Sequence, residues 1–355
     1  MLFQCPCVQD ITSNHHLGQS VQAGYSSETG LRFCRSLHQD AVRRRYYRRN
    51  NEDKTVLHRG QLKLLCAEIE FLTNFASKGD IVLYVGAAPG RHIHYLTKLF
   101  PELSYILYDP APFSKELLSN RVCTLHSTCF TEENARTYAS TGNKILFISD
   151  IRTGDFLEDS DRVVEQHVIA NMTKQREWYE IIQPKKALLK FRLPWREGST
   201  EYLNGDIMLP VFGGVTTTET RLVPSTGTSN YDHIQYQDQL FFFNTHVRIA
   251  RYEHPMEVDK QKLGLDHCYD CTAFLEVVKS YVLKYAQPDA DVGIAAQAQK
   301  IVQYCMIACY GDCKTLFKSN FDPGDRVENI RKRQWIENRP AYENRAHLKT
   351  KRTKK

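Results

Sequence analysis

Apolar residues recur at helical spacing in one stretch near the start of the chain and in two stretches near its end. The first covers residues 60–75, where the apolar positions lie three or four residues apart: Leu62, Leu65, Ile69, Leu72 and Phe75. Residues 271–286 and 295–310 have the same helix-like texture. We therefore expect a helix in each stretch.

Seven short runs between these stretches are rich in branched and aromatic residues, as strands are. They are residues 81–85, 104–109, 121–127, 144–150, 187–193, 219–224 and 239–250. Helix-length segments separate the first five, notably residues 161–182, and this alternation predicts a mainly parallel sheet covered by helices on both faces. The last two runs follow each other closely, which predicts an antiparallel edge. The expected fold class is α/β with a mostly parallel seven-stranded sheet.

The same patterns divide the chain into four parts. We expect an N-terminal extension over residues 1–57, an α/β core over 58–255, a helical part packed on the core over 256–330, and a flexible tail over 331–355.

The composition of the chain indicates in which cellular compartment the protein is located. The chain has 355 residues, 42% of them hydrophobic, enough for a large core. No apolar run is long enough to span a bilayer, and the first ten residues lack the features of a secretory signal. Eleven scattered cysteines, an odd number, indicate reduced thiols rather than a disulfide framework. We expect an intracellular, cytoplasmic protein with no membrane partner.

Positive charge is concentrated near the two ends. Residues 331–355 hold ten Lys or Arg and two Asp or Glu, a net charge of +8 against +6 for the whole chain. The run "RRRYYRR" over residues 43–49 adds five more positive charges. Such runs are either solvated charge clusters or contacts for a polyanion, and the paired tyrosines of the first could stack on bases.

A tight turn follows the first strand-like run. The stretch "DIVLYVGAAPGRHIHYL" over residues 80–96 predicts a strand, a turn with Gly86 and Gly90, and a helix. Small residues let a ligand approach the backbone, and Asp109 ends the next strand where a carboxylate can hold ribose hydroxyls. No Gly-Lys-Ser/Thr follows, and Pro89 departs from the dinucleotide pattern. Adenosine without a bound pyrophosphate fits best, as in S-adenosylmethionine.

Four charged residues lie on the elements around that turn. Lys63 is in the helix before it, Asp150 ends the fourth run, Lys190 interrupts the apolar fifth, and Glu219 begins the sixth. Each alone could be an edge or snorkelling side chain. A lysine inside an apolar strand is costly to bury unless it is paired, so the set points to one charged site.

These segments together resemble a known family. "GQLKLL", "YVGAAPGRHIHYL", "ILFISDIR", "LLKFRLPW" and "ETRL" are similar, in order and spacing, to poxvirus cap-specific mRNA (nucleoside-2'-O-)-methyltransferases, which also serve as poly(A) polymerase regulatory subunits. The resemblance covers residues 59–244. It implies a Rossmann-like methyltransferase fold, S-adenosylmethionine as donor, capped mRNA as substrate, a poly(A) polymerase catalytic subunit as possible partner, and a viral replication site or virion as location.

The resemblance also implies roles for single residues. Lys63, Asp150, Lys190 and Glu219 would form the catalytic tetrad, with Lys190 accepting the proton of a ribose 2'-hydroxyl. Lys63, the donor sulfonium and partial burial would each lower the pKa of Lys190. The donor-binding positions would be Gln61, Tyr84, Gly86, Gly90, His92, Asp109 and Asp150, with Thr131 a looser match.

Recognition of a methylated cap calls for a different surface. Methylated guanine is a cationic ring, suited to stacking on aromatic side chains beside a carboxylate. Trp195 and Glu197 in "LPWRE" take the family's aromatic and acidic places, and Tyr46 or Tyr47 could supply the second aromatic face. The family's guanine-binding glutamate falls on Gln237, beside Asp238. For Trp195 the alternative is an ordinary half-buried aromatic.

Other readings stay open. Cys268, Cys271, Cys305, Cys309 and Cys313 could form a zinc site, but the last three are spaced like one helix face, and we expect no metal. In place of a cap enzyme, the chain could be a 2'-O-methyltransferase acting on other RNA, or a non-catalytic RNA-binding processivity subunit. Trp195 with Glu197 favours the cap, and the complete tetrad argues against an accessory role alone.

Overall fold

The computed structural model describes residues 33–47, 59–154, 160–214, 216–248, 252, 269–285 and 293–310. Its centre is a seven-stranded sheet in the order β3-β2-β1-β4-β5-β7-β6. The first five strands are parallel, and β7 runs antiparallel to both of its neighbours. The strands are β1 (Ile81–Val85), β2 (Ser104–Tyr108), β3 (Cys123–His126), β4 (Ile145–Ser149), β5 (Lys186–Phe191), β6 (Ser199–Met208) and β7 (Thr220–Asp232).

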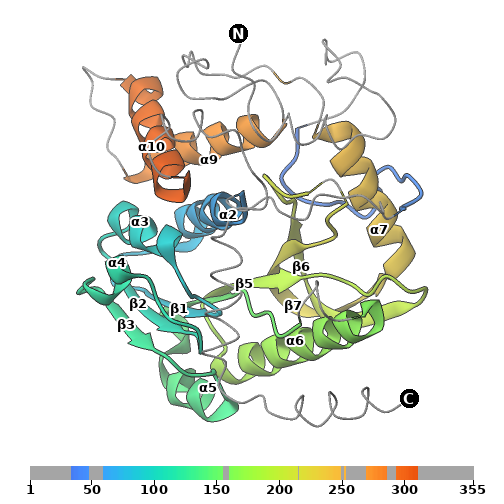
Figure 1. Cartoon of the computed structure of the whole chain (residues 1–355), viewed down its shortest axis with the longest axis horizontal. Coiled ribbons are helices and arrows are strands. Elements are labelled where there is room, and N and C mark those ends of the chain that lie inside the picture. The colour runs from blue at the N-terminus through green and yellow to red at the C-terminus, as the bar shows by residue number, and fades with distance from the viewer. Residues whose placement is uncertain are drawn as a thin grey trace, which may run out of the picture.

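Helices cover both faces of this sheet (Figure 1). One group contains α2 (Arg59–Phe75), α3 (Arg91–Leu99), α9 (Tyr269–Tyr285) and α10 (Gly293–Tyr310), which pack on one another; α5 (Glu132–Tyr138) and α6 (Asp161–Ile182) lie on the other side. The remaining helices are α4 (Lys115–Leu118), α7 (His233–Phe242), a 3-10 turn (Ala139–Lys144) and a π-helix (Phe243–Val247). The predicted α/β fold with helices on both faces is confirmed.

The central strands could be recognised in the sequence because they are buried on both faces. All five residues of β4 are buried, as are four of the five in β1. Such strands appear as continuous apolar runs between helices, which is the pattern of parallel sheets. The predicted helix over residues 161–182 has the bounds of α6.

Two elements at the far edge differ from the prediction. Residues 239–248, the described part of the predicted run 239–250, do not form a strand: α7 and the π-helix run from His233 to Val247, and the Asp232 carboxylate caps α7 by accepting from the Gln235 backbone N–H at 2.6 Å. The edge strand is instead β6, whose polar residues hid it and whose pairing with β7 is irregular between Leu203 and Gly205. An aromatic run fits either a strand or a buried helix face, and here helix capping decides.

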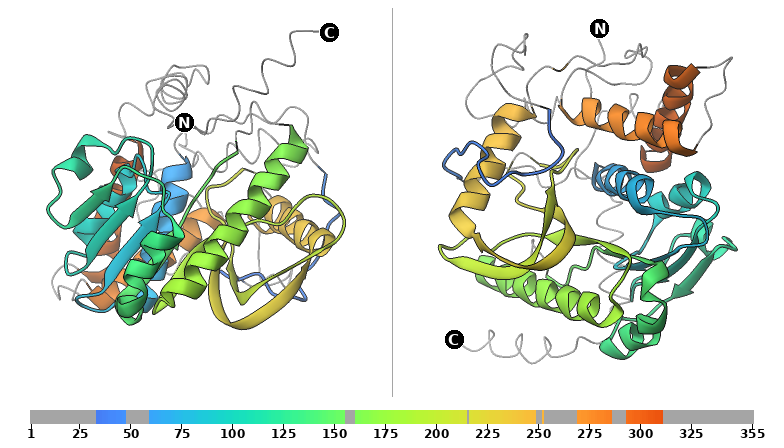
Figure 2. Two further views of the ribbon diagram at one scale, coloured as in Figure 1. Left: turned by 90° about the horizontal axis from the view of Figure 1, so that it is seen from below. Right: turned by 180° about the vertical axis from the view of Figure 1, so that it is seen from behind.

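The segment over residues 33–47 joins the edge of the sheet to α7. The Leu37 N–H donates to Ile207 O and the Leu209 N–H to Arg35 O, each at 2.8 Å, so this segment pairs with the end of β6. It then runs beside α7, as both Figure 1 and Figure 2 show, where the Gln239 amide donates to Gln39 O at 2.8 Å. Part of the predicted N-terminal extension is therefore built into the core.

No helix in the described ranges is long and apolar enough to cross a membrane. Among the same residues no group of three or more His, Cys, Asp or Glu could hold a metal ion. Cys271 and Cys305 are buried, and neither forms a disulfide with another described residue. Cys268 and Cys313 of the alternative zinc set, like the basic tail over residues 331–355, lie outside the described residues.

Candidate active site

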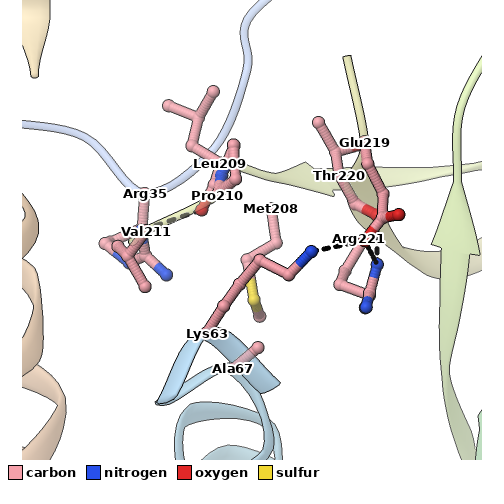
Figure 3. A pocket seen from close by; sticks show the side chains of 10 residues that line it. All are labelled: Arg35, Lys63, Ala67, Met208, Leu209, Pro210, Val211, Glu219, Thr220 and Arg221. Atoms are coloured by element: carbon pink, nitrogen blue, oxygen red, sulfur yellow. Dashed lines mark hydrogen bonds and ion pairs between the residues drawn. The ribbon is translucent and has the colours of Figure 1, made fainter. Parts of the chain in front are cut away.

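The four predicted tetrad residues meet at one edge of the sheet. Asp150 follows β4 directly, Lys190 lies near the end of β5, and Glu219 immediately precedes β7. Because β7 is antiparallel to β5, the start of β7 lies at the carboxyl edge of the parallel strands, where ligands bind in open α/β sheets. Lys63 reaches the same place from the first turns of α2 (Figure 3).

Ion pairs join these residues into one network. The Lys190 ammonium lies 2.9 Å from Asp150 Oδ1 and 3.4 Å from Glu219 Oε2, and Lys63 Nζ lies 2.5 Å from Glu219 Oε1. The Lys190 and Glu219 side chains are only 14% and 12% exposed. The arrangement holds two amines against two carboxylates, largely out of water.

Two arginines that the sequence reading missed belong to this network. Arg221 donates to Asp150 Oδ1 at 2.7 Å and to Glu219 Oε1 at 3.1 Å. Arg152, half exposed, donates to Glu219 Oε2 at 3.3 Å. Arg221 is the cross-strand partner of Lys190, so both side chains stand on one face of the sheet. The "ETRL" motif contains Arg221, but only the strand pairing shows its place.

Burial lowers the pKa of the Lys190 ammonium to about 8, with Arg152 and Arg221 acting in the same direction and Asp150 and Glu219 opposing. The expected direction is found, although the assisting cations are these arginines rather than Lys63. Burial alone would raise the pKa of the Glu219 carboxyl, yet Lys190, Lys63 and the arginines hold it well below its ordinary value. Lys190 is thus the member of the network that can change its protonation near neutral pH.

The loop that carries Glu219 is held through its backbone carbonyls. Side chains from residues 33–47, α7 and the π-helix each donate to one carbonyl: Tyr46 to Thr216 O at 3.1 Å, Asn244 to Thr217 O at 2.9 Å and Tyr236 to Thr218 O at 2.7 Å. Arg248, fully buried in an ion pair with Asp270 at 2.6 Å, donates to Asn244 Oδ1 at 3.1 Å. These bonds fix the approach of Glu219 to the two lysines.

The turn after β1 has the geometry of a close ligand approach. Gly86 has a φ of 84°, and a Cβ there would lie 2.8 Å from the carbonyl atoms of Asp150. Gly90, with φ of 65°, precedes α3, and a Cβ there would meet the Leu117 side chain at 2.4 Å. Only glycine fits either position without strain. The two glycines therefore let the turn pack directly against the backbone of Asp150 and against Leu117.

Asp109 directly follows β2 and supports the turn after β1. Its carboxylate accepts from the backbone N–H groups of Ala88 at 3.0 Å and Ala111 at 2.7 Å. Burial raises the pKa of the Asp109 carboxyl to about 6, and the two backbone hydrogen bonds oppose the shift. Each carboxylate oxygen has a second lone pair, so the group can also accept from a ribose.

Three further donor-binding candidates form a chain beside the turn. His92 Nδ1 lies 2.9 Å from Gln61 Oε1, and its Nε2 lies 3.1 Å from Glu68 Oε1, which also accepts from the Tyr84 hydroxyl at 2.7 Å. His92 and Tyr84 are buried, whereas Gln61 is partly exposed. Thr131 is the N-cap of α5, with its hydroxyl bonded to Asn134; its donor contact stays a prediction.

Trp195 lies in the loop after β5 with a cation on one face. The Arg192 guanidinium is 4.0 Å from the centre of its ring, and the backbone N–H of Trp195 donates to Glu165 Oε1 at 2.6 Å. Glu197, two residues on, is exposed. The Arg192 guanidinium therefore makes a cation–π contact with this indole.

The other cap candidates lie around the same loop. Gln237 is buried and its amide donates to Pro194 O at 2.9 Å, while Asp238 Oδ1 accepts from the Tyr46 N–H at 2.8 Å. The Tyr46 hydroxyl is engaged with the Glu219 loop, whereas Tyr47 is 40% exposed and packs on Phe241. The structure thus gives Gln237 and Tyr46 backbone-holding contacts that the sequence did not suggest.

The strand order with a single antiparallel strand, the glycine turn after β1 and the charged cluster at the carboxyl edge define a Rossmann-like methyltransferase fold. A family model described as poly A polymerase regulatory subunit matches residues 34–281. The chain belongs to this family, as its motifs predicted.

Two poxvirus proteins are similar to this chain over about half of its length. The chain is 28% identical over 214 residues to the cap-specific mRNA (nucleoside-2'-O-)-methyltransferase of Fowlpox virus (strain NVSL), covering 53% of this chain and 68% of that protein. The protein of the same name from Myxoma virus (strain Lausanne) is 26% identical over 220 residues, covering 56% of this chain and 64% of its own length. The matches thus span about two thirds of these relatives.

A solved structure of bluetongue virus VP4, described as a multifunctional RNA-capping production-line, is similar over 67% of this chain and 42% of its own length. The identity is 15% and the TM-score 0.36.

Proposed function

We propose that this protein is a methyltransferase that moves a methyl group from S-adenosylmethionine to the ribose 2'-hydroxyl of the first transcribed nucleotide of capped mRNA. The observation that carries the proposal is the buried amine of Lys190, held between Asp150 and Glu219 with its pKa lowered to about 8. The names of the poxvirus relatives support the same reaction.

The donor fits the residues around the turn. Gly86 and Gly90 give the turn a backbone path that other residues could not follow, Asp109 can accept from ribose hydroxyls, and Gln61 offers a partly exposed amide. S-adenosylmethionine, when bound, supplies an electrophilic sulfonium methyl group that the ribose oxygen takes as the sulfonium becomes a thioether.

The side chains of the network act on the acceptor, the ribose 2'-hydroxyl. Lys190 in its neutral form accepts the proton of the 2'-hydroxyl as the new carbon–oxygen bond forms. Asp150 and Glu219 orient the two amines, and Lys63 contributes positive charge near the developing oxyanion. Arg221 holds both carboxylates in place from the neighbouring strand. Orientation and proton removal together account for catalysis without a metal.

The cap base, in this proposal, stacks on the ring of Trp195, with Glu197 as the acid beside it and Tyr47 or Tyr46 as the opposing ring. A methylated guanine carries a positive charge, which the aromatic face attracts. Arg43 and Arg45, both exposed on the segment before Tyr47, are placed to meet phosphates.

A second role follows from the family description. We propose that the chain also binds a poly(A) polymerase catalytic subunit as its regulatory partner, a role that the family name and the basic ends of the chain support. A cytoplasmic viral replication site or the virion remains the predicted location.

The test is methyl transfer from labelled S-adenosylmethionine to three short RNAs that share a sequence and carry a methylated cap, an unmethylated cap or no cap. We expect label in the RNA with the methylated cap. Equal label in uncapped RNA would favour a general RNA 2'-O-methyltransferase. Binding of S-adenosylhomocysteine and RNA without transfer to any RNA would favour an accessory subunit.

A further inference from the structure

A buried carboxylate lies at the centre of the hydrogen-bonded side chains beside the turn after β1. Glu68 is 1% exposed, and its Oε1 accepts from the Tyr84 hydroxyl at 2.7 Å and from His92 Nε2 at 3.1 Å. We propose that Glu68 is a positioning residue of the donor site, which acts through His92 to present the amide of Gln61 to the carboxylate of the amino-acid part of the donor. This inference rests on the donor assignment of the proposed function.

The first support is the cost of the arrangement. A carboxylate buried to this degree is expensive unless its hydrogen-bonding capacity is met, and Glu68 Oε2 has no partner among the described residues. An apolar residue at this place in α2 would avoid that cost, as its neighbours Leu65, Ile69 and Leu72 do. Buried ionisable groups of this kind gather at functional sites.

The second support is the direction of the hydrogen bonds. Gln61 Oε1 can only accept, so His92 Nδ1 donates to it, while Nε2 of the same ring faces the Glu68 carboxylate. With its oxygen engaged by His92, Gln61 has only its two amide N–H groups left to offer.

The third support is the change in side-chain exposure along this row of hydrogen-bonded residues. Tyr84, Glu68 and His92 are buried at 1%, 1% and 2% exposure, and Gln61 alone is partly exposed. Gln61 lies at the start of α2 and His92 at the start of α3, beside the Gly86 to Gly90 turn. The buried chain thus ends in one amide at the turn, with N–H groups that suit a carboxylate ligand.

The experiment compares Glu68→Gln with Glu70→Gln. Glu70 lies two residues further along α2 and pairs instead with Arg35 at 2.6 Å, so it controls for the loss of a paired carboxylate in this helix. Affinity for S-adenosylhomocysteine is measured by calorimetry, and donor KM, RNA KM and kcat by methyl transfer. We expect Glu68→Gln to weaken donor affinity about tenfold and to raise donor KM alike, with RNA KM unchanged, whereas Glu70→Gln changes donor affinity by less than about twofold.

A double substitution tests whether Glu68 acts through Gln61. Gln61→Ala removes the presented amide, so adding Glu68→Gln to it should cost less than about twofold in further donor affinity. Additive losses would overturn the inference, as would an unchanged affinity in Glu68→Gln. Tyr84→Phe, which removes one donor to Glu68, replaces Glu68→Gln in both comparisons if that variant does not fold. Failure of the wild-type protein to bind S-adenosylhomocysteine would instead contradict the proposed function.

Discussion

Replacing Lys190 by arginine separates the charge of this residue from its ability to take a proton. A guanidinium keeps the positive charge that pairs with Asp150 and Glu219, but it does not give up its proton at accessible pH. We expect Lys190→Arg to fold, to bind S-adenosylhomocysteine within about twofold of the wild type, and to lose methyl transfer by a factor of roughly 10² to 10⁴, the usual worth of a general base.

The size of the effect follows from the pKa. Burial brings the pKa of Lys190 to about 8. At pH 7 about a tenth of the molecules then carry a neutral amine, against roughly one in 3,000 for a lysine with an ordinary pKa near 10.5, a gain of about 300-fold in available base. Because the neutral amine is the active form, the rate should rise with pH, about tenfold per unit well below pH 8, and level off above it.

Single-turnover methyl transfer to capped RNA, measured from about pH 6 to 9.5, gives this profile without interference from product release. Donor affinity of Lys190→Arg, measured in parallel, controls for damage to the donor site. A wild-type rate that is flat across this range, or a Lys190→Arg variant with more than about a tenth of the wild-type rate, would remove Lys190 from the role of base.

Four further predictions address the surroundings. Arg152→Gln removes a half-exposed cation that lowers the pKa of Lys190, so the midpoint of the rate profile should move to higher pH by a few tenths of a unit; a shift to lower pH would contradict the electrostatics. Asp109→Asn should weaken donor affinity by about 1.5–3 kcal/mol in calorimetry, and an unchanged affinity would exclude the ribose contact. Trp195→Ala should weaken a methylated cap analogue by about 1–2 kcal/mol in fluorescence titrations and spare uncapped RNA, whereas equal losses would refute the cap pocket. Removal of residues 331–355 should weaken all RNAs alike and flatten the salt dependence, and a loss restricted to capped RNA would contradict a phosphate role.

Much of the fold could be read from the sequence because its central strands are buried on both faces. β1, β2, β4 and β5 appear as apolar runs between helices, and α6 as a helix-length segment between two of them. The strand at the edge of the sheet was harder to predict. β6 faces solvent along much of its length, so its pattern is mixed, and the aromatic run at the end of α7 has the composition of a strand.

Two of the four clustered residues stand out in the sequence itself, because Lys190 breaks an apolar strand and Asp150 follows one. The assignment of all four as a tetrad came from the family resemblance, and their catalytic role stays a prediction. The roles of Arg221 and Arg192 could not be predicted, because a charged residue in or near an edge strand is ordinary. Only the register with β5 places Arg221 beside Lys190, and only the contact with the Trp195 ring gives Arg192 a role. Glu68 was hidden for another reason: one acid among several in α2 carries no signal until its burial is known.

The position of the transferred methyl group tests the central claim most directly. The protein is incubated with S-adenosylmethionine and an RNA that bears a methylated cap, the product is digested with a nuclease that leaves the cap dinucleotide intact, and the fragments are identified by mass spectrometry. We predict a single added methyl group on the ribose of the first transcribed nucleotide, absent with Lys190→Arg. A methyl group on a base, on an internal ribose or on no fragment would contradict the account.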